Sequence, residues 1–126
     1  EEDSEIILIN YYGSVLKYYE NFKQIFIGKS LIKKLEKDGG QNPIDAAKMG
    51  CFIFHGPYVS NFREIYEYLN SENISSKIDS KNILAEKLIK NFNSGFPVNN
   101  TKAIKLNKYS EEIFYKVIKE YERIIL

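Results

Sequence analysis

The sequence has few of the residues that carry chemistry in soluble enzymes. Among its 126 residues there is one cysteine, one histidine, one methionine and no tryptophan. The single cysteine, Cys51, excludes an intrachain disulfide and favours a reducing compartment. The single histidine, His55, does not make a closed set of metal ligands with Cys51, and no serine stands around it in a hydrolase pattern. We therefore expect no metal site, no catalytic triad and no cofactor.

Long apolar runs and an excess of one charge are also missing. No apolar stretch approaches the roughly 20 residues needed to cross a bilayer, and no signal peptide opens the chain, so we expect this piece to be soluble. Eighteen basic and seventeen acidic residues leave a formal net charge of +1, which gives no support for a nucleic-acid partner. The length suits a single domain, spanning residues 1–126. Because the chain begins at Glu1, we expect it to be part of a longer protein.

Three largely apolar runs, residues 6–9, 24–27 and 51–54, predict strands of a parallel sheet. Residues 74–78 are expected to form a fourth, weaker strand. Runs that are continuous instead of alternating are typical of strands buried on both faces. Because a segment with helical spacing or helix-start signals follows each run, we predict an α/β fold, a Rossmann-like parallel sheet with helices on both faces.

Helix boundaries follow from proline, glycine and serine positions. Pro43 suits the first turn of a short helix that has Asn42 as its N-cap and ends at Gly50, after a polar loop over residues 29–38. Ser60 and Ser80 are expected to cap two later helices. The inner face of the helix after Ser80 is predicted to carry Leu84, Leu88 and Phe92. An irregular stretch is expected next, and then a final helix from about Ser110 with a broad apolar face.

Glycines and small polar residues gather where the predicted strands end. In an open parallel sheet, ligands bind beyond the carboxyl ends of the strands, beside helix N-termini. The ends of the predicted strands are residues 10–13, residues 28–30 with the following loop to Asn42, residues 55–61 and the turn near Asp79, and the glycines and small polar residues concentrate at the first three. Unpaired N–H groups and the positive dipole end at a helix start suit a phosphate, and glycines allow its close approach. The spacing is neither a Walker nor a dinucleotide motif, which leaves ATPase and NAD-dependent roles without their usual support.

Asp45 has two competing interpretations. It stands three residues after Asn42, so the pair makes a variant of the capping box in which each side chain bonds to the other residue's backbone. Its carboxylate also offers two oxygens on one plane, which match the two hydroxyl donors of a ribose 2′,3′-diol. From the residues alone, a structural and a ligand-binding role for this segment are both open.

Three segments together resemble a known family. The runs 25–31 (IFIGKSL), 39–47 (GGQNPIDAA) and 54–57 (FHGP), followed by Asn61 and Phe62, are similar in order and spacing to the C-terminal domain of 3-deoxy-D-manno-octulosonic acid (Kdo) transferases. They span about a third of the chain. The chain departs from the family pattern in having Lys29 for a second glycine, Asp45 for glutamate, and Tyr58 for the histidine that commonly follows the Gly-Pro pair.

The resemblance implies the donor half of a GT-B glycosyltransferase. Such an enzyme transfers Kdo from CMP-Kdo to a lipid A precursor in lipopolysaccharide biosynthesis, with inversion and without a metal, at the cytoplasmic face of the bacterial inner membrane. The catalytic carboxylate and the acceptor site belong to an N-terminal domain that this chain lacks, and the first strands of the C-terminal domain would precede Glu1. No catalytic residue is therefore expected here, and the chain alone should not turn over.

The resemblance also assigns residues to the donor site. Those that match the family motifs and would border the CMP moiety are Gly28, Ser30, Gly39, Gly40, Gln41, Asn42 and Asp45. Those that would shape the adjoining loop are Gly56, Pro57 and Asn61. Two alternatives stay open: a non-catalytic α/β interaction module, and a glycosyltransferase domain that uses a different nucleotide sugar.

Overall fold

The computed structural model of the chain describes residues 8–9, 13–94 and 100–125. Its centre is a parallel sheet of three strands, β1 (Gln24–Phe26), β2 (Phe52–His55) and β3 (Ser75–Lys77), in the order β1-β2-β3. Ile25 is opposite Ile53 in the register, and Phe54 is opposite Ser76. This confirms the predicted parallel sheet for the last three of the four expected strands. Of the first run, residues 6 and 7 lie outside the described residues, and Leu8 and Ile9 are not in a strand.

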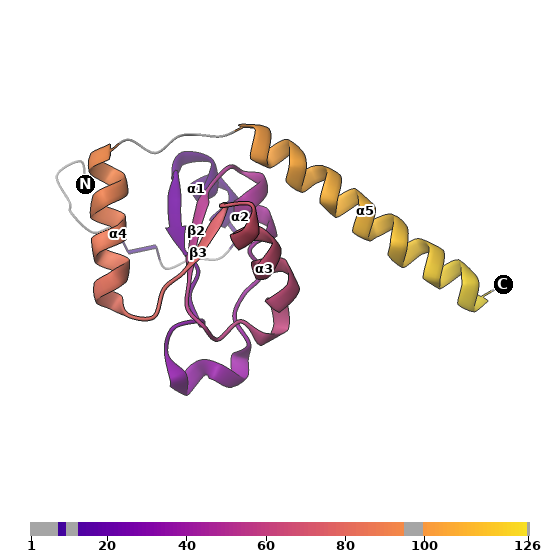
Figure 1. The fold of residues 1–126 in the computed structure, drawn as a ribbon, viewed down its shortest axis with the longest axis horizontal. Coiled ribbons are helices and arrows are strands. Elements are labelled where there is room, and N and C mark those ends of the chain that lie inside the picture. The colour runs from indigo at the N-terminus through magenta and orange to yellow at the C-terminus, as the bar shows by residue number, and fades with distance from the viewer. Residues whose placement is uncertain (1–7, 10–12, 95–99, 126) are drawn as a thin grey trace.

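Helices cover both faces of the sheet. The two crossovers contain α2 (Ile44–Lys48) and α3 (Arg63–Ser71), which pack on the same face because successive parallel crossovers share one hand. On the opposite face lies α4 (Lys81–Ser94), whose Lys87 donates a hydrogen bond to Ser76. Figure 1 shows these three layers, with α4 on one side of the strands and α2 and α3 on the other. The fold is therefore α/β, as predicted.

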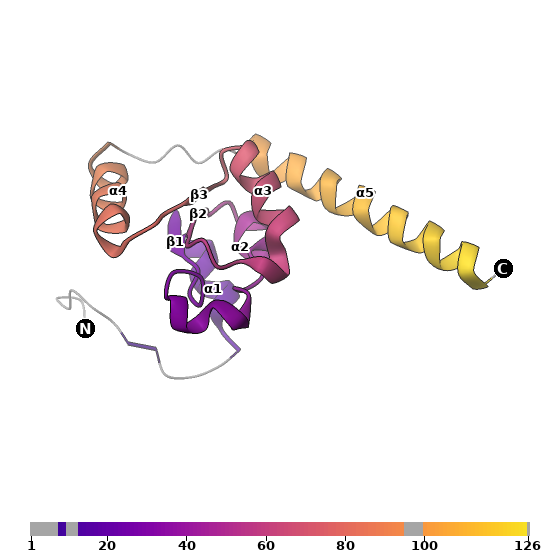
Figure 2. The same ribbon diagram turned by 60° about the horizontal axis from the view of Figure 1, so that its bottom comes forward.

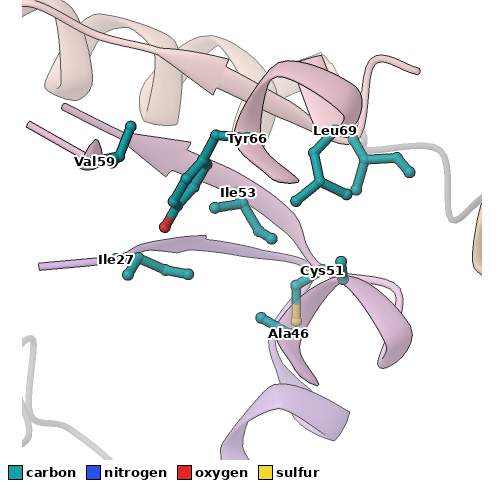
Figure 3. Close-up of a cluster of buried hydrophobic side chains, with 9 residues drawn as sticks. Ile27, Ala46, Cys51, Ile53, Val59, Tyr66 and Leu69 are labelled. Carbon is teal, nitrogen blue, oxygen red and sulfur yellow. The ribbon is translucent and has the colours of Figure 1, made fainter. Parts of the chain in front are cut away.

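The main core lies between the sheet and the layer of α2 and α3 (Figure 3). The side chains of Tyr66 and Leu69 on α3 pack in one cluster with Ile53 of β2, and all three are almost fully buried. The whole cluster comprises Ile27, Ala46, Ala47, Cys51, Ile53, Val59, Tyr66, Leu69 and Ile74. The helix before the sheet, α1 (Val15–Asn21), joins this side, since the Cys51 thiol lies 3.2 Å from the Tyr19 carbonyl oxygen. Burial raises the pKa of the Cys51 thiol, in keeping with a structural role.

Two predicted boundaries near the loops are wrong. Residues 29–38 are not a loop throughout, because a 3-10 helix, η1 (Lys33–Asp38), occupies their second half. It ends at Gly39, whose φ of 67° lets the chain turn away. Ser60 does not cap α3: it opens a 3-10 turn, η2 (Ser60–Phe62), and α3 starts only after Phe62. The turn forms because the Phe62 amide donates to the Val59 carbonyl at 2.9 Å.

The predicted cap at Ser80 agrees with the structure, whereas α2 has Pro43, not Asn42, at its N-cap position and begins at Ile44. Asn42 Oδ1 accepts a hydrogen bond from the Ile44 amide at 3.0 Å, at the start of α2. Ser80 Oγ accepts one from the Ile83 amide at 3.2 Å, at the start of α4. The predicted inner face of α4 is only partly right, because Leu84 and Leu88 are half-buried whereas Phe92 is 84% exposed.

The last helix is longer than predicted. α5 (Asn100–Ile125) begins well before Ser110 and contacts α2 near its start, after which it extends away from the sheet (Figures 1 and 2). Residues 95–99 of the stretch expected to be irregular lie outside the described residues, as does Leu126. Several apolar side chains of the second half are exposed, including Val117 and Ile124. No helix in the described part of the chain is both long and apolar enough to span a membrane.

Candidate functional site

The loops that leave β1 and β2 are joined by hydrogen bonds through Ser30. Its hydroxyl is completely buried, donates to the Ile27 carbonyl at 2.7 Å and accepts from the Gly56 amide at 2.9 Å. The Ser30 carbonyl in turn accepts from the Tyr58 amide at 2.8 Å. The loop after the first strand is thereby fixed to the loop after the second. The Ser30 hydroxyl both donates and accepts within this junction, so it lies beneath the candidate site and not on its surface.

Gly56 lies directly against the backbone of the neighbouring loop. A Cβ atom at this position would overlap the carbonyl oxygen of Ser30 and the Cα atom of Leu31. Only glycine permits this approach, so packing alone accounts for the glycine at position 56 and no ligand needs to be invoked. Pro57 follows it and is exposed at the same edge.

A second junction fixes the segment of residues 39–42, which we call the glycine turn. The Asn61 backbone N–H donates to the Gly39 carbonyl at 3.1 Å, and the Asn61 side-chain Nδ2 donates to the Asp38 carbonyl, also at 3.1 Å. The Tyr66 hydroxyl donates to the Gln41 carbonyl at 2.8 Å. Through these contacts the glycine turn packs on the segment that follows β2. The segments 28–30, 39–45 and 56–61, which are separate in sequence, therefore meet at the carboxyl edge of the sheet.

The glycine turn presents unpaired backbone donors. Gly39 and Gly40 have positive φ values of 67° and 81°. The N–H groups of Gly40, Gln41 and Asn42 donate no hydrogen bond to any other described residue. Successive N–H groups around left-handed residues form concave sites that attract anions. This turn is chemically suited to hold a phosphate without a metal.

Asp45 lies beside this turn, in the first turn of α2, with its side chain exposed. The capping box is not formed: the Asn42 side chain accepts from the Ile44 amide and not from that of Asp45, and the Asp45 carboxylate makes no hydrogen bond or ion pair with the described residues. The purely structural account of Asp45 as the returning half of the box is therefore wrong. Its carboxylate is left available to a hydroxyl donor outside the chain.

Positive charge near the site comes from exposed lysines. Lys29 Nζ is 3.9 Å from the Asp38 carboxylate, and both side chains are about half exposed. Such a pair adds little stability. Within the described residues, no group of histidine, cysteine and acidic side chains is arranged to hold a metal ion.

Tyr66 belongs to the buried apolar side of α3 and lies outside the motif segments. The structure adds that its hydroxyl holds the glycine turn and that its ring lies 4.3 Å from the His55 ring, centre to centre. A tyrosine within an otherwise apolar stripe is the available signal, because a buried hydroxyl requires a partner. The identity of that partner, 25 residues away in sequence, is visible only in three dimensions.

His55 is buried at the end of β2 and is held from both sides. Its Nδ1 is 2.8 Å from the Gly56 carbonyl oxygen; because the atom that faces Nε2 is also an oxygen acceptor, a neutral ring can donate to only one of the two. Its Nε2 is 3.2 Å from Oδ1 of Asn70, which also accepts from the Ser75 hydroxyl. Burial lowers the pKa of His55 below its ordinary value, and this outweighs the two hydrogen bonds that act in the opposite direction.

Acidification from pH 7.5 to 5.5 is expected to destabilise the domain through His55. The pKa of His55 in the folded state lies below the unfolded value of about 6.5, so the unfolded state binds more protons in this window. The free energy of unfolding therefore decreases as the pH is lowered. Urea unfolding at the two pH values measures the change. His55→Asn should be less stable at pH 7.5 but nearly insensitive to pH over this range, since the chain has no other histidine. Equal wild-type stability at both values would contradict the assignment.

A comparison of the chain with known protein families and with curated protein sequences finds no match.

Proposed function

We propose that this chain is the donor-binding half of a Kdo transferase of the GT-B type and that its carboxyl edge holds the CMP part of CMP-Kdo. The observation that carries the proposal is the meeting of the three motif segments at one edge, around three unpaired N–H groups and a free carboxylate. A nucleoside monophosphate requires both kinds of group, donors for its phosphate and an acceptor for its ribose diol.

The roles of the residues follow from their placement. The N–H groups of Gly40, Gln41 and Asn42 bind the phosphate, and Asp45 accepts hydrogen bonds from the ribose hydroxyls. Gly28, Ser30, Gly56 and Pro57 form the floor and wall, and Asn61 supports the glycine turn. Neutralisation of the single phosphate by backbone dipoles agrees with a donor that needs no metal.

The backbone at Lys29 accounts for one departure from the family pattern. Lys29 has a φ of 58°, a left-handed conformation that glycine adopts freely. The chain thus keeps a glycine-like backbone at the position where the family usually has its second glycine. This supports the resemblance from an observation independent of residue identity.

The remaining parts of the reaction are assigned to a longer protein. We propose that an N-terminal domain supplies the catalytic carboxylate and binds the lipid A precursor, at the cytoplasmic face of the inner membrane. In this proposal the chain alone binds the donor but does not catalyse transfer, and nucleic acid is not among its partners.

CMP is expected to bind the isolated chain and to shift the amide signals of Gly40, Gln41 and Asn42 in a two-dimensional NMR titration. Asp45→Ala should weaken CMP binding by about tenfold, because a carboxylate that accepts hydrogen bonds contributes roughly 1.5–3 kcal/mol. Asp79→Ala is a matched control, since Asp79 is another exposed aspartate and lies outside the three motif segments. An unchanged spectrum at millimolar CMP would count against the proposal.

The same titration with UMP and UDP tests the donor base. Preference for a uridine nucleotide would retain a glycosyltransferase but replace CMP-Kdo with another nucleotide sugar.

A second candidate function, a non-catalytic interaction module, is favoured by one observation. Val117, Ile124 and Ile125 of α5 are at least 60% exposed. Such an apolar stripe suits packing against another protein. If no nucleotide perturbs the glycine turn and α5 instead becomes protected in a complex, this reading replaces the first.

A further inference from the structure

Tyr66 is fixed at both of its ends although it lies outside the motif segments. Only 1% of the residue is exposed, its ring packs on His55, and its hydroxyl donates to the Gln41 carbonyl. Figure 3 shows Tyr66 within the buried cluster. Burial raises the pKa of the hydroxyl, so it stays protonated and acts as a donor at all ordinary pH values.

The bond to Gln41 sets the direction of an N–H group. In a trans peptide the C=O and the following N–H point in opposite directions across one plane. The described residues contain no cis peptide. Since Tyr66 draws the Gln41 carbonyl inward, the Asn42 N–H must point outward. By the same logic, the hydrogen bond from the Asn61 backbone amide to the Gly39 carbonyl fixes the direction of the Gly40 N–H, although Gly40 itself is buried.

We propose that Tyr66 is a positioning residue that orients the glycine turn for anion binding by holding the Gln41 peptide plane. The inference rests on the proposed function for its ligand, but the orientation itself belongs to the free protein. Without the hydroxyl, the Gln41–Asn42 peptide is free to rotate, since Gln41 is exposed and water can satisfy its carbonyl. Gly39 and Gly40, on its N-terminal side, are buried against Asn61 and Val59, so we expect the rotation to be confined to the Gln41–Asn42 peptide.

The test is Tyr66→Phe, which keeps the ring on His55 and removes only the donor. Tyr68→Phe is the control, because it removes a hydroxyl from the same helix. In the free protein, the amide signals of Gly40, Gln41 and Asn42 are expected to shift and broaden, while those of β2 and β3 stay in place. The dissociation constant for CMP is expected to rise about three- to tenfold, the value of one hydrogen bond, and not in the control.

The two readouts separate the two proposals. If the turn amides of the free Tyr66→Phe protein match the wild type, the positioning role is overturned, whatever CMP does. If those amides change but CMP affinity does not, the turn's orientation is not used in binding, and the positioning role is again overturned. If wild-type protein does not bind CMP at all, the proposed function fails, and inorganic phosphate, titrated into wild type and Tyr66→Phe, then decides whether the oriented turn binds an anion.

Discussion

Gly56→Ala is expected to lower the free energy of unfolding by about 3 kcal/mol or more, a large effect for a single added methyl group. The methyl would overlap the Ser30 carbonyl oxygen and the Leu31 Cα atom, and neither is the end of a flexible side chain that can move aside. Separation of the two loops would also weaken the hydrogen bond from the Gly56 amide to Ser30 Oγ. Urea unfolding followed by circular dichroism measures the loss.

Gly28→Ala is the matched control on the neighbouring loop. No heavy atom lies within 4 Å of a Cβ built there, and its φ is outside the left-handed region. Its unfolding free energy should therefore stay within about 0.5 kcal/mol of wild type. If the two variants are equally stable, the packing of the loops against each other is not as described.

Leu69→Ala is expected to cost about 2–5 kcal/mol, the usual range for a leucine truncated in a packed core. Leu69 has no exposed surface and lies in the cluster with Ile53 and Tyr66. Few neighbours can move into the space, because they come from a strand and a helix fixed by their own hydrogen bonds. Chemical unfolding reports the change in midpoint.

Ile89→Ala on α4 provides the comparison, because Ile89 is 62% exposed. It should cost less than about 1 kcal/mol. A larger effect for Ile89 than for Leu69 would place the main core on the α4 side of the sheet, contrary to the structure.

The apolar runs made the sheet predictable, whereas hydrogen bonds within the loops decided where the helices begin. The continuous run ending in Phe54 predicted a strand covered on both faces, and the successive residues Ile53, Phe54 and His55 of β2 are all buried. Ser60, by contrast, is a good cap by type, yet the turn between Val59 and Phe62 takes up the residues it would have capped. Phe92 fits the stripe of α4 by spacing, but its ring is left exposed.

The candidate site divides in the same way. Spacing placed Gly39, Gly40 and Asp45 at a helix start beside a strand end, where the structure has them. Spacing did not indicate that the Ser30 hydroxyl is hydrogen-bonded within the protein, because its partner, the Gly56 amide, is 26 residues away in sequence. Nor did it identify Tyr66. Contacts of this kind depend on the relative placement of elements, which no local pattern encodes.

The strand order has a consequence for how the chain reaches its fold. Each strand lies next to the strand that precedes it in sequence, and the pairs Phe26–Phe54 and Ile53–Ser75 each close a loop of about 20 to 30 residues. Every new strand can therefore dock on one already in place, at a similar entropic cost, without threading between earlier ones. The sheet can grow in one direction as the chain leaves the ribosome, and the glycine turn acquires its partners Asn61 and Tyr66 only when the second crossover docks.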